Sequence, residues 1–224
     1  MNRMLASVNC LDEARTVQQI GADIIDLKQP ALGALGALDT QLVQTIVSEL
    51  GGTQPISATV GDLPMQAELI SQAVQAMAAT GVDYVKIGFF PDQDWDEVIS
   101  QLQICTQDDL KLIAVLFADQ QPNLNTVTKF AAAGFAGVML DTMDKNNGSL
   151  TQVMPLDTIQ HFVKLAKQQQ LLSGLAGSLR ATDIKSLLPL QADYLGFRGA
   201  LCKQHQRTAE LDPLATADIK AALT

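Results

Sequence analysis

The sequence alternates eight short apolar runs with segments of helical spacing, and this strict order leaves few possible folds. Alternating strands and helices force neighbouring strands to run parallel, joined by helical crossovers. Eight such units in 224 residues predict a single (β/α)8 TIM barrel with a closed parallel sheet, one domain over residues 1–224. The runs lie at residues 4–8, 22–28, 55–60, 82–88, 110–118, 135–140, 171–176 and 192–197.

Helix signals lie between these runs. Asp12 and Glu13 stand in the first turn of the first segment, where the helix dipole favours acidic side chains. Thr182 is predicted to cap a short seventh helix. No glycine motif of a dinucleotide-binding fold or a P-loop is present, which disfavours both. The helices are predicted at residues 11–20, 39–50, 66–80, 94–105, 123–133, 155–170 and 182–188, and after Pro213.

Composition and charge exclude several functional classes. Hydrophobic residues make up 47% of the chain, enough for a large core, and the net charge is -9. Broad binding to nucleic acid or to an anionic membrane needs clustered basic residues, so neither is expected. No apolar run reaches membrane-spanning length, and the N-terminal run is too short for a signal peptide. Three widely spaced cysteines suit reduced thiols, so we expect a cytoplasmic protein.

Charged side chains end the four even-numbered runs: Asp26 and Lys28, then Lys86, Asp141 and Arg198. For one Asp-x-Lys pair, a surface salt bridge is the simpler interpretation. In this fold, however, the active site lies at the carboxyl ends of the strands, and alternate strands supply one layer of the lumen. Buried unpaired charge is also costly. The repeated pattern therefore predicts a functional site.

Two lysines facing one lumen disfavour each other's charged form, which pushes one toward a neutral, nucleophilic amine. Such an amine is what a Schiff base requires. Asp26 and Asp141 would hold the second cation and relay protons. The set, with Lys28 and Lys86, predicts carbonyl chemistry without a metal or another cofactor.

The loops after the seventh and eighth runs predict a phosphate site, because barrels of this kind often bind phosphate there through backbone amides. Gly177 and Gly199 allow the backbone to approach an anion, Ser178 can donate a hydrogen bond, and Arg198 offers a guanidinium fork. The expected partner is a small phosphorylated molecule.

Two other kinds of site are poorly supported. Cys202 and His205 have the spacing of a metal pair, but structural zinc needs four ligands and His161 lies within a predicted helix. A serine hydrolase is disfavoured because no Gly-x-Ser-x-Gly motif is present and neither histidine ends a strand.

Six motifs at the predicted strand ends resemble the (5-formylfuran-3-yl)methyl phosphate synthase family, also called 4-(hydroxymethyl)-2-furancarboxaldehyde-phosphate (4-HFC-P) synthase. The resemblance covers nearly the whole chain, and the motifs occur in order. They are GADIIDLK at residues 21–28, SATVGD at 57–62, YVKIG at 84–88, MLDT at 139–142, LAGS at 175–178 and GFRGA at 196–200.

This resemblance implies a lyase of methanofuran biosynthesis that condenses two molecules of glyceraldehyde 3-phosphate into a furan aldehyde phosphate, with loss of phosphate and water. It implies that Lys28 is the Schiff-base lysine and Lys86 the proton acceptor. Asp26, Asp141 and Lys145 match further active-site positions.

The sequence departs from the family pattern at Ala34, where a serine is frequent, and at Asn146-Asn147, where an acidic residue is usual. These departures concern the loop contacts and not the lysines. A class I aldolase of another phosphosugar and a non-catalytic phosphometabolite-binding barrel remain alternatives. A homo-oligomer is compatible with the sequence, which does not define the number of subunits.

Overall fold

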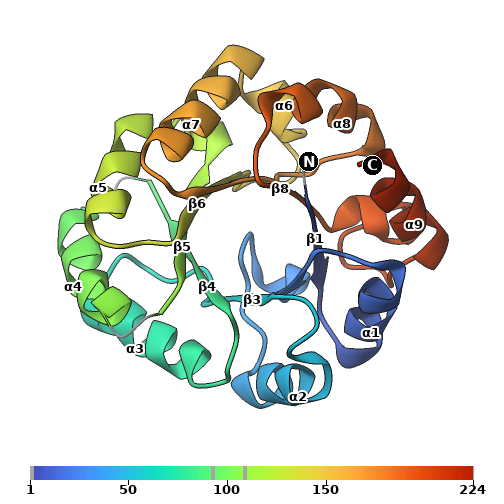
Figure 1. The fold of residues 1–224 in the computed structure, drawn as a ribbon, viewed down its shortest axis with the longest axis horizontal. Helices are drawn as coiled ribbons and strands as arrows, with labels where there is room; N and C mark the ends of the chain where they lie inside the picture. The colour runs from blue at the N-terminus through green and yellow to red at the C-terminus, as the bar shows by residue number, and fades with distance from the viewer. Residues whose placement is uncertain (1–2, 92–93, 108–109, 224) are drawn as a thin grey trace.

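The computed structural model describes residues 3–91, 94–107 and 110–223, and its eight strands close into a parallel barrel in the order β1 to β8. Helices surround the barrel in Figure 1. The predicted (β/α)8 fold is confirmed. The strands are β1 Arg3–Val8, β2 Ile24–Leu27, β3 Ile56–Thr59, β4 Tyr84–Phe89, β5 Leu112–Phe117, β6 Gly137–Asp141, β7 Leu172–Leu175 and β8 Tyr194–Phe197.

The helices cover the outside of this sheet. They are α1 Leu11–Ile20, α2 Thr40–Leu50, α3 Ala67–Ala78, α4 Asp96–Gln107, α5 Val127–Ala132, α6 Leu150–Val153, α7 Leu156–Gln168, α8 Ala181–Leu187 and α9 Pro213–Ala222. Asp39 caps α2 by accepting a hydrogen bond from Gln41 N at 2.9 Å. No helix among the described residues is long and apolar enough to cross a membrane.

Two local predictions differ from the structure. Thr182 does not cap α8, which begins at Ala181. Instead, the Arg180 N–H donates to Asp183 Oδ2 at 2.7 Å and fixes the first turn. The four-residue helix α6 was not predicted, because one helical turn leaves no periodic pattern to detect.

Apolar residues form two cores that the sheet separates. The larger core lies between the outer face of the sheet and the helices. The smaller core fills the lumen and includes Leu5, Ile24, Val115, Met139 and Tyr194. Because side chains alternate along a strand, Asp26, two residues after Ile24 in β2, also points into the lumen. The barrel is thus packed at one level and carries polar side chains above it.

The parallel pairing of β1 with β8 closes the barrel, with Arg3 opposite Tyr194 and Leu5 opposite Gly196. All eight strands therefore end at the same rim, where their following loops meet. This topology brings the first and last units of the sequence together around one opening.

Candidate active site

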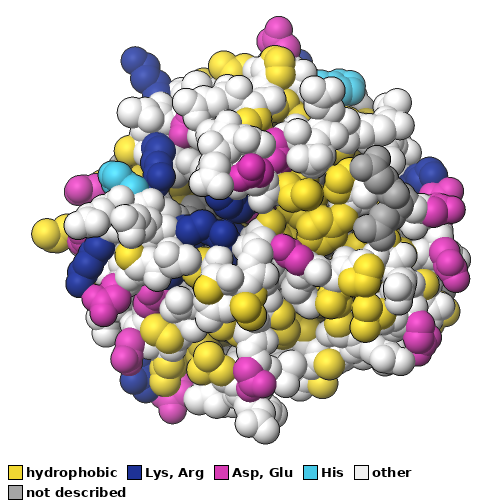
Figure 2. Space-filling model, turned by 180° about the vertical axis from the view of Figure 1, so that it is seen from behind, with side chains coloured by type: hydrophobic (Ala, Val, Ile, Leu, Met, Phe, Trp, Pro, Cys, Tyr) yellow, Lys and Arg dark blue, Asp and Glu magenta, His cyan; other side chains and the backbone are white. Residues whose placement is uncertain are grey.

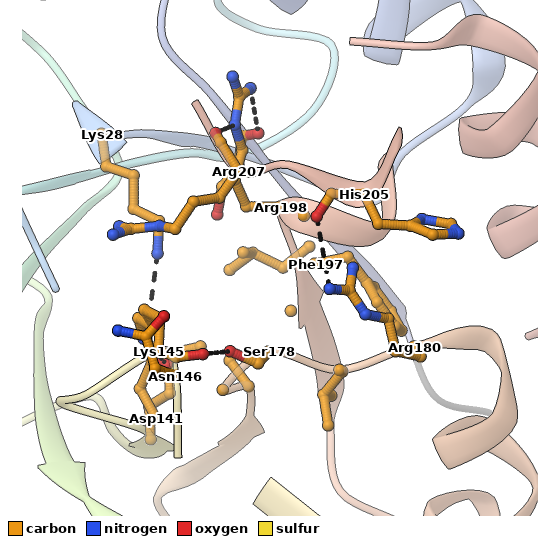
Figure 3. A pocket seen from close by; sticks show the side chains of 18 residues that line it. Lys28, Asp141, Lys145, Asn146, Ser178, Arg180, Phe197, Arg198, His205 and Arg207 are labelled. Atoms are coloured by element: carbon orange, nitrogen blue, oxygen red, sulfur yellow. Dashed lines mark hydrogen bonds and ion pairs between the residues drawn. The ribbon is translucent and has the colours of Figure 1, made fainter. Parts of the chain in front are cut away.

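A cavity of about 250 Å³ opens at this rim, and Figure 3 shows the side chains that line it. Its walls come from β1 through Ser7, from the residue after β2, Lys28, and from Asp141 at the end of β6. The loops after β7 and β8 complete it with Ser178 and Arg198. The structure thus brings together most of the residues that the sequence pattern selected.

Lys28 and Lys145 both contact the Asp141 carboxylate in this cavity. Lys28 Nζ lies 3.8 Å from Oδ2, and Lys145 Nζ lies 2.6 Å from Oδ1. Lys145 also donates to the Thr142 carbonyl. Burial alone would raise the pKa of Asp141, but the two ammonium groups outweigh burial and lower that pKa to about 2. Asp141 is therefore ionised at neutral pH.

Burial lowers the pKa of Lys28 to about 8 from 10.5. Asp141 opposes this shift, while Lys145 and Lys86 add to it by repulsion. About a tenth of the Lys28 amine is then uncharged at pH 7, a few hundredfold more than for an ordinary lysine. The sequence argument expected one lysine of the lumen to be pushed toward a neutral amine, and burial moves the pKa of Lys28 in that direction.

Lys86 and Asp26 form a second pair that is almost completely buried, with exposed side-chain fractions of 1% and 0%. Lys86 Nζ lies 2.6 Å from Asp26 Oδ1. Ser57 Oγ donates to Oδ1 and Ser7 Oγ to Oδ2, each at 2.7 Å. Burial would raise the pKa of Asp26, but the charges of Lys86 and Lys28 and the hydrogen bonds from Lys86 and Ser57 hold it below its usual value.

The two lysines thus occupy different environments. Lys28 lines the large cavity, whereas Lys86 lines a separate void of about 10 Å³ between Tyr84 and Tyr194. Ser7 lines the large cavity and Ser57 the small void. A continuous chain of hydrogen bonds therefore runs from Lys86 through Asp26 to Ser7 at the cavity wall.

Gly177, Ser178 and Gly199 line the cavity as the sequence predicts. Gly177 has a φ of 107°, and a Cβ there would lie 2.9 Å from Thr142 N, so this turn requires glycine. Ser178 Oγ donates to the Lys145 carbonyl at 3.4 Å. The polar loop after β7 is thereby attached to the loop after β6.

Arg198 lines the cavity, and the protein itself binds its guanidinium group. Its Nη1 and Nη2 contact the Glu13 carboxylate at 2.5 and 3.2 Å, and its Nε donates to the Arg207 carbonyl at 2.8 Å. Further bonds reach the Ser7 and Ala209 carbonyls. Every nitrogen of the guanidinium thus has a protein partner. The phosphate fork at Arg198 stays a prediction; in the structure this side chain ties the loop after β8 to β1 and α1.

Sequence reasoning missed four polar side chains of this region. Ser7 and Ser57 interrupt apolar strands at inward-facing positions, a signal that alternation could have revealed. Arg180 and Arg207 also line the cavity but lie in loops, where no periodic pattern indicates the direction of a side chain.

The departure at Ala34 leaves the loop after β2 intact. Asp62 accepts hydrogen bonds from the backbone N–H groups of Ala34 and Leu35, both at 2.7 Å. A Cβ at Gly33 would lie 2.1 Å from the same carboxylate, so Gly33 is needed for this contact. Backbone groups carry the interaction, and the missing serine does not break it. Asn146 lies at the edge of the cavity.

Basic side chains gather near the centre of the face shown in Figure 2, although the chain as a whole is acidic. Of the described residues that line the cavity, Asp141 supplies the one carboxylate, against five lysines and arginines. The described residues include no cluster of three or more His, Cys, Asp or Glu side chains arranged for a metal ion. The cavity is suited to an anionic ligand.

Solved structures that match this fold include 3-hexulose-6-phosphate synthase from Salmonella typhimurium, with a TM-score of 0.71 and 17% identity over 99% of this chain and 98% of that one. Phosphoribosyl anthranilate isomerase from Thermotoga maritima gives the same TM-score, with 11% identity over 100% and 98% of the two chains. At these identities the likeness concerns the barrel alone.

Sequence relatives are more specific. A Methylorubrum extorquens protein, provisionally named (5-formylfuran-3-yl)methyl phosphate synthase, is 40% identical over 99% of this chain and 91% of its own. The (5-formylfuran-3-yl)methyl phosphate synthase of Methanopyrus kandleri is 33% identical over 92% and 91%. The family model described as 4-HFC-P synthase matches residues 4–220. The chain belongs to the 4-HFC-P synthase family.

Proposed function

We propose that this chain is a Schiff-base lyase that condenses two molecules of glyceraldehyde 3-phosphate into (5-formylfuran-3-yl)methyl phosphate in methanofuran biosynthesis. The reaction releases one phosphate and two molecules of water. The observation that carries the proposal is the Lys28 amine, which faces the cavity and whose pKa burial lowers to about 8. The family relatives named for this product support the choice of substrate.

In the first step, the uncharged Lys28 amine attacks the aldehyde carbon of one triose, and loss of water leaves an imine. The protonated imine carries a positive charge where the ammonium group stood. Because Asp141 is ionised and 3.8 Å away, it stabilises that charge. Lys145, held by Asp141, lies within reach of the same site and can donate a proton to a leaving oxygen.

Lys86 is the proton acceptor that the family resemblance implies. It does not line the large cavity, so we infer that protons reach it by way of Ser7 and Asp26, whose hydrogen bonds connect the two levels of the barrel. In this proposal Lys28 is the nucleophile, and Asp26 holds the acceptor in place.

Borohydride reduction in the presence of glyceraldehyde 3-phosphate tests the nucleophile. We expect peptide mapping to locate the added mass on Lys28, and mass spectrometry to identify the furan product when the triose is the sole substrate. Lys28→Arg should fold normally but abolish both signals, because arginine keeps the charge and lacks the nucleophile.

Lys203→Arg is the matched control, since Lys203 is exposed and pairs with Glu210. Added mass on Lys86 or Lys145 would overturn the assignment of Lys28. An imine without the furan product would indicate an aldolase of another phosphosugar, and no imine at all would indicate a binding protein.

A further inference from the structure

The cavity contains more positive charge than its own carboxylates offset. Glu13 offsets Arg198, and Asp141 lies between Lys28 and Lys145. Within the described parts of the chain, Arg180 and Arg207 have no carboxylate at ion-pair distance, although both line the cavity. In a protein with a net charge of -9, two such guanidinium groups point to an anionic ligand.

Arg180 has a donor that the protein leaves without an acceptor. Its Nη1 is buried and has no hydrogen-bond partner among the described residues, while Nη2 donates weakly to the His205 carbonyl at 3.4 Å. A buried donor on a charged group is costly when it stays unsatisfied. A Cβ at Gly199 would lie 3.1 Å from Nη1, so glycine leaves room beside this donor. The arrangement suits an oxyanion between the loops after β7 and β8.

Arg207 reaches the cavity from another direction. Its Nη2 donates to the Gly33 carbonyl at 2.7 Å, which holds the side chain across the rim toward the loop after β2. In Figure 3 it extends toward Lys28, whereas Arg180 lies on the opposite side of the view, near His205. Burial lowers the pKa of Arg207, so the protein alone compensates its charge incompletely.

We propose that the cavity binds two phosphoryl groups at once, one against Arg180 and the glycine turns after β7 and β8, and the other against Arg207 on the Lys28 side. This inference deepens the proposed function and rests on it for the identity of the ligands, because a condensation of two phosphorylated trioses brings two such groups into one site. A guanidinium is suited to each, since it can bind two phosphate oxygens through parallel hydrogen bonds.

Two separate phosphate subsites would also fix how the two trioses lie relative to each other. Fixing each triose by its phosphate leaves the two carbon chains facing each other near Lys28, and holding reactants in this way lowers the entropic part of the barrier. One site with a single phosphate fork would hold one triose and leave the second to diffuse.

Equilibrium dialysis with radiolabelled glycerol 3-phosphate tests the proposal. This probe carries the phosphate but no carbonyl, so it binds without forming an imine. We expect two molecules bound per wild-type chain and one per chain for Arg180→Met and for Arg207→Met, with binding at the altered subsite weakened tenfold or more. The double variant should bind none in the same range.

Lys203→Met is the matched control, an exposed basic residue in the same loop as Arg207, and should still bind two. Arg180→Lys and Arg207→Lys keep the charge and guard against misfolding of the methionine variants; each should restore part of the binding. One molecule per wild-type chain, or two in both methionine variants, would overturn the inference. Two bound molecules without formation of a furan would instead overturn the proposed function and leave the two subsites standing.

Discussion

The Lys86–Asp26 and Lys28–Asp141 pairs use the same two residue types in one barrel but differ in distance and in surroundings. The first pair is 2.6 Å apart and sealed beneath the cavity, with two serine hydroxyls completing the carboxylate. The second is 3.8 Å apart at the cavity wall, and its carboxylate is shared with Lys145. In the close pair, Lys86 and the two serines satisfy the Asp26 carboxylate, whereas the long, shared pair leaves the Lys28 amine poorly compensated. Reactivity therefore follows the weaker pairing.

Replacing each lysine by methionine should give the largest difference between the two pairs, measured as the loss in the free energy of unfolding. Lys86→Met leaves the buried Asp26 carboxylate without its cation, so we expect the free energy of unfolding to fall by about 3–5 kcal/mol. Lys28→Met removes a charge that burial already disfavours, so we expect a change within about 1 kcal/mol. Urea denaturation at pH 7 measures both. Equal losses of unfolding free energy would show that the two pairs contribute alike to stability and would contradict the difference drawn between them.

The neighbours of Lys28 should move its pKa in opposite directions. Asp141→Asn removes the attraction that opposes the shift, so the pKa should fall below 8; Lys145→Met removes a repulsion, so it should rise. Each change should be about one unit. The free amine, and with it the rate of imine formation, increases as the pH rises through the pKa. Competitive labelling of Lys28 across pH 6–10, quantified by mass spectrometry, measures the midpoint. Shifts of the same sign in both variants would contradict this electrostatic account.

Replacing the two serines that bind Asp26 should give the smallest difference in stability. Ser57→Ala removes a hydrogen bond to a buried carboxylate that water cannot easily reach, at a cost of about 1–2 kcal/mol. Ser7→Ala opens onto the large cavity, where a water molecule can take over the bond, and should cost about half as much. Thermal unfolding of the two variants, measured side by side, tests the order. A larger loss of stability for Ser7→Ala would mean that water in the cavity does not replace the hydrogen bond from Ser7 to Asp26.

The order of strands and helices could be predicted because hydrophobic periodicity extends over each element. All eight strands and the ring of charges at Lys28, Lys86 and Asp141 lie where alternation places them. Alternation could not predict how deep each lysine lies along the barrel axis, with Lys28 at the cavity and Lys86 at the smaller void. That depth depends on the stagger of neighbouring strands, such as Thr59 opposite Lys86, which no single strand encodes.

The loops limited the prediction for a different reason. Arg198 ends a strand, as a catalytic residue of this fold does, but Glu13 in α1 lies close enough to bind it. Arg207 carries no signal in the sequence, yet it reaches the rim. Loop conformations depend on contacts between distant segments, and a guanidinium takes its direction from whichever acceptors those segments supply.

The Arg198–Glu13 contact also bears on how the molecule is made. These residues stand 185 positions apart, and β8 supplies the missing neighbour of β1. While the ribosome is still adding the seventh unit, the outer edge of β1 has no strand to pair with and Glu13 has no cation. An open sheet edge is a template for pairing with another chain. The nascent polypeptide therefore exposes this edge of β1 until β8 has been made, and pairing with β8 covers it.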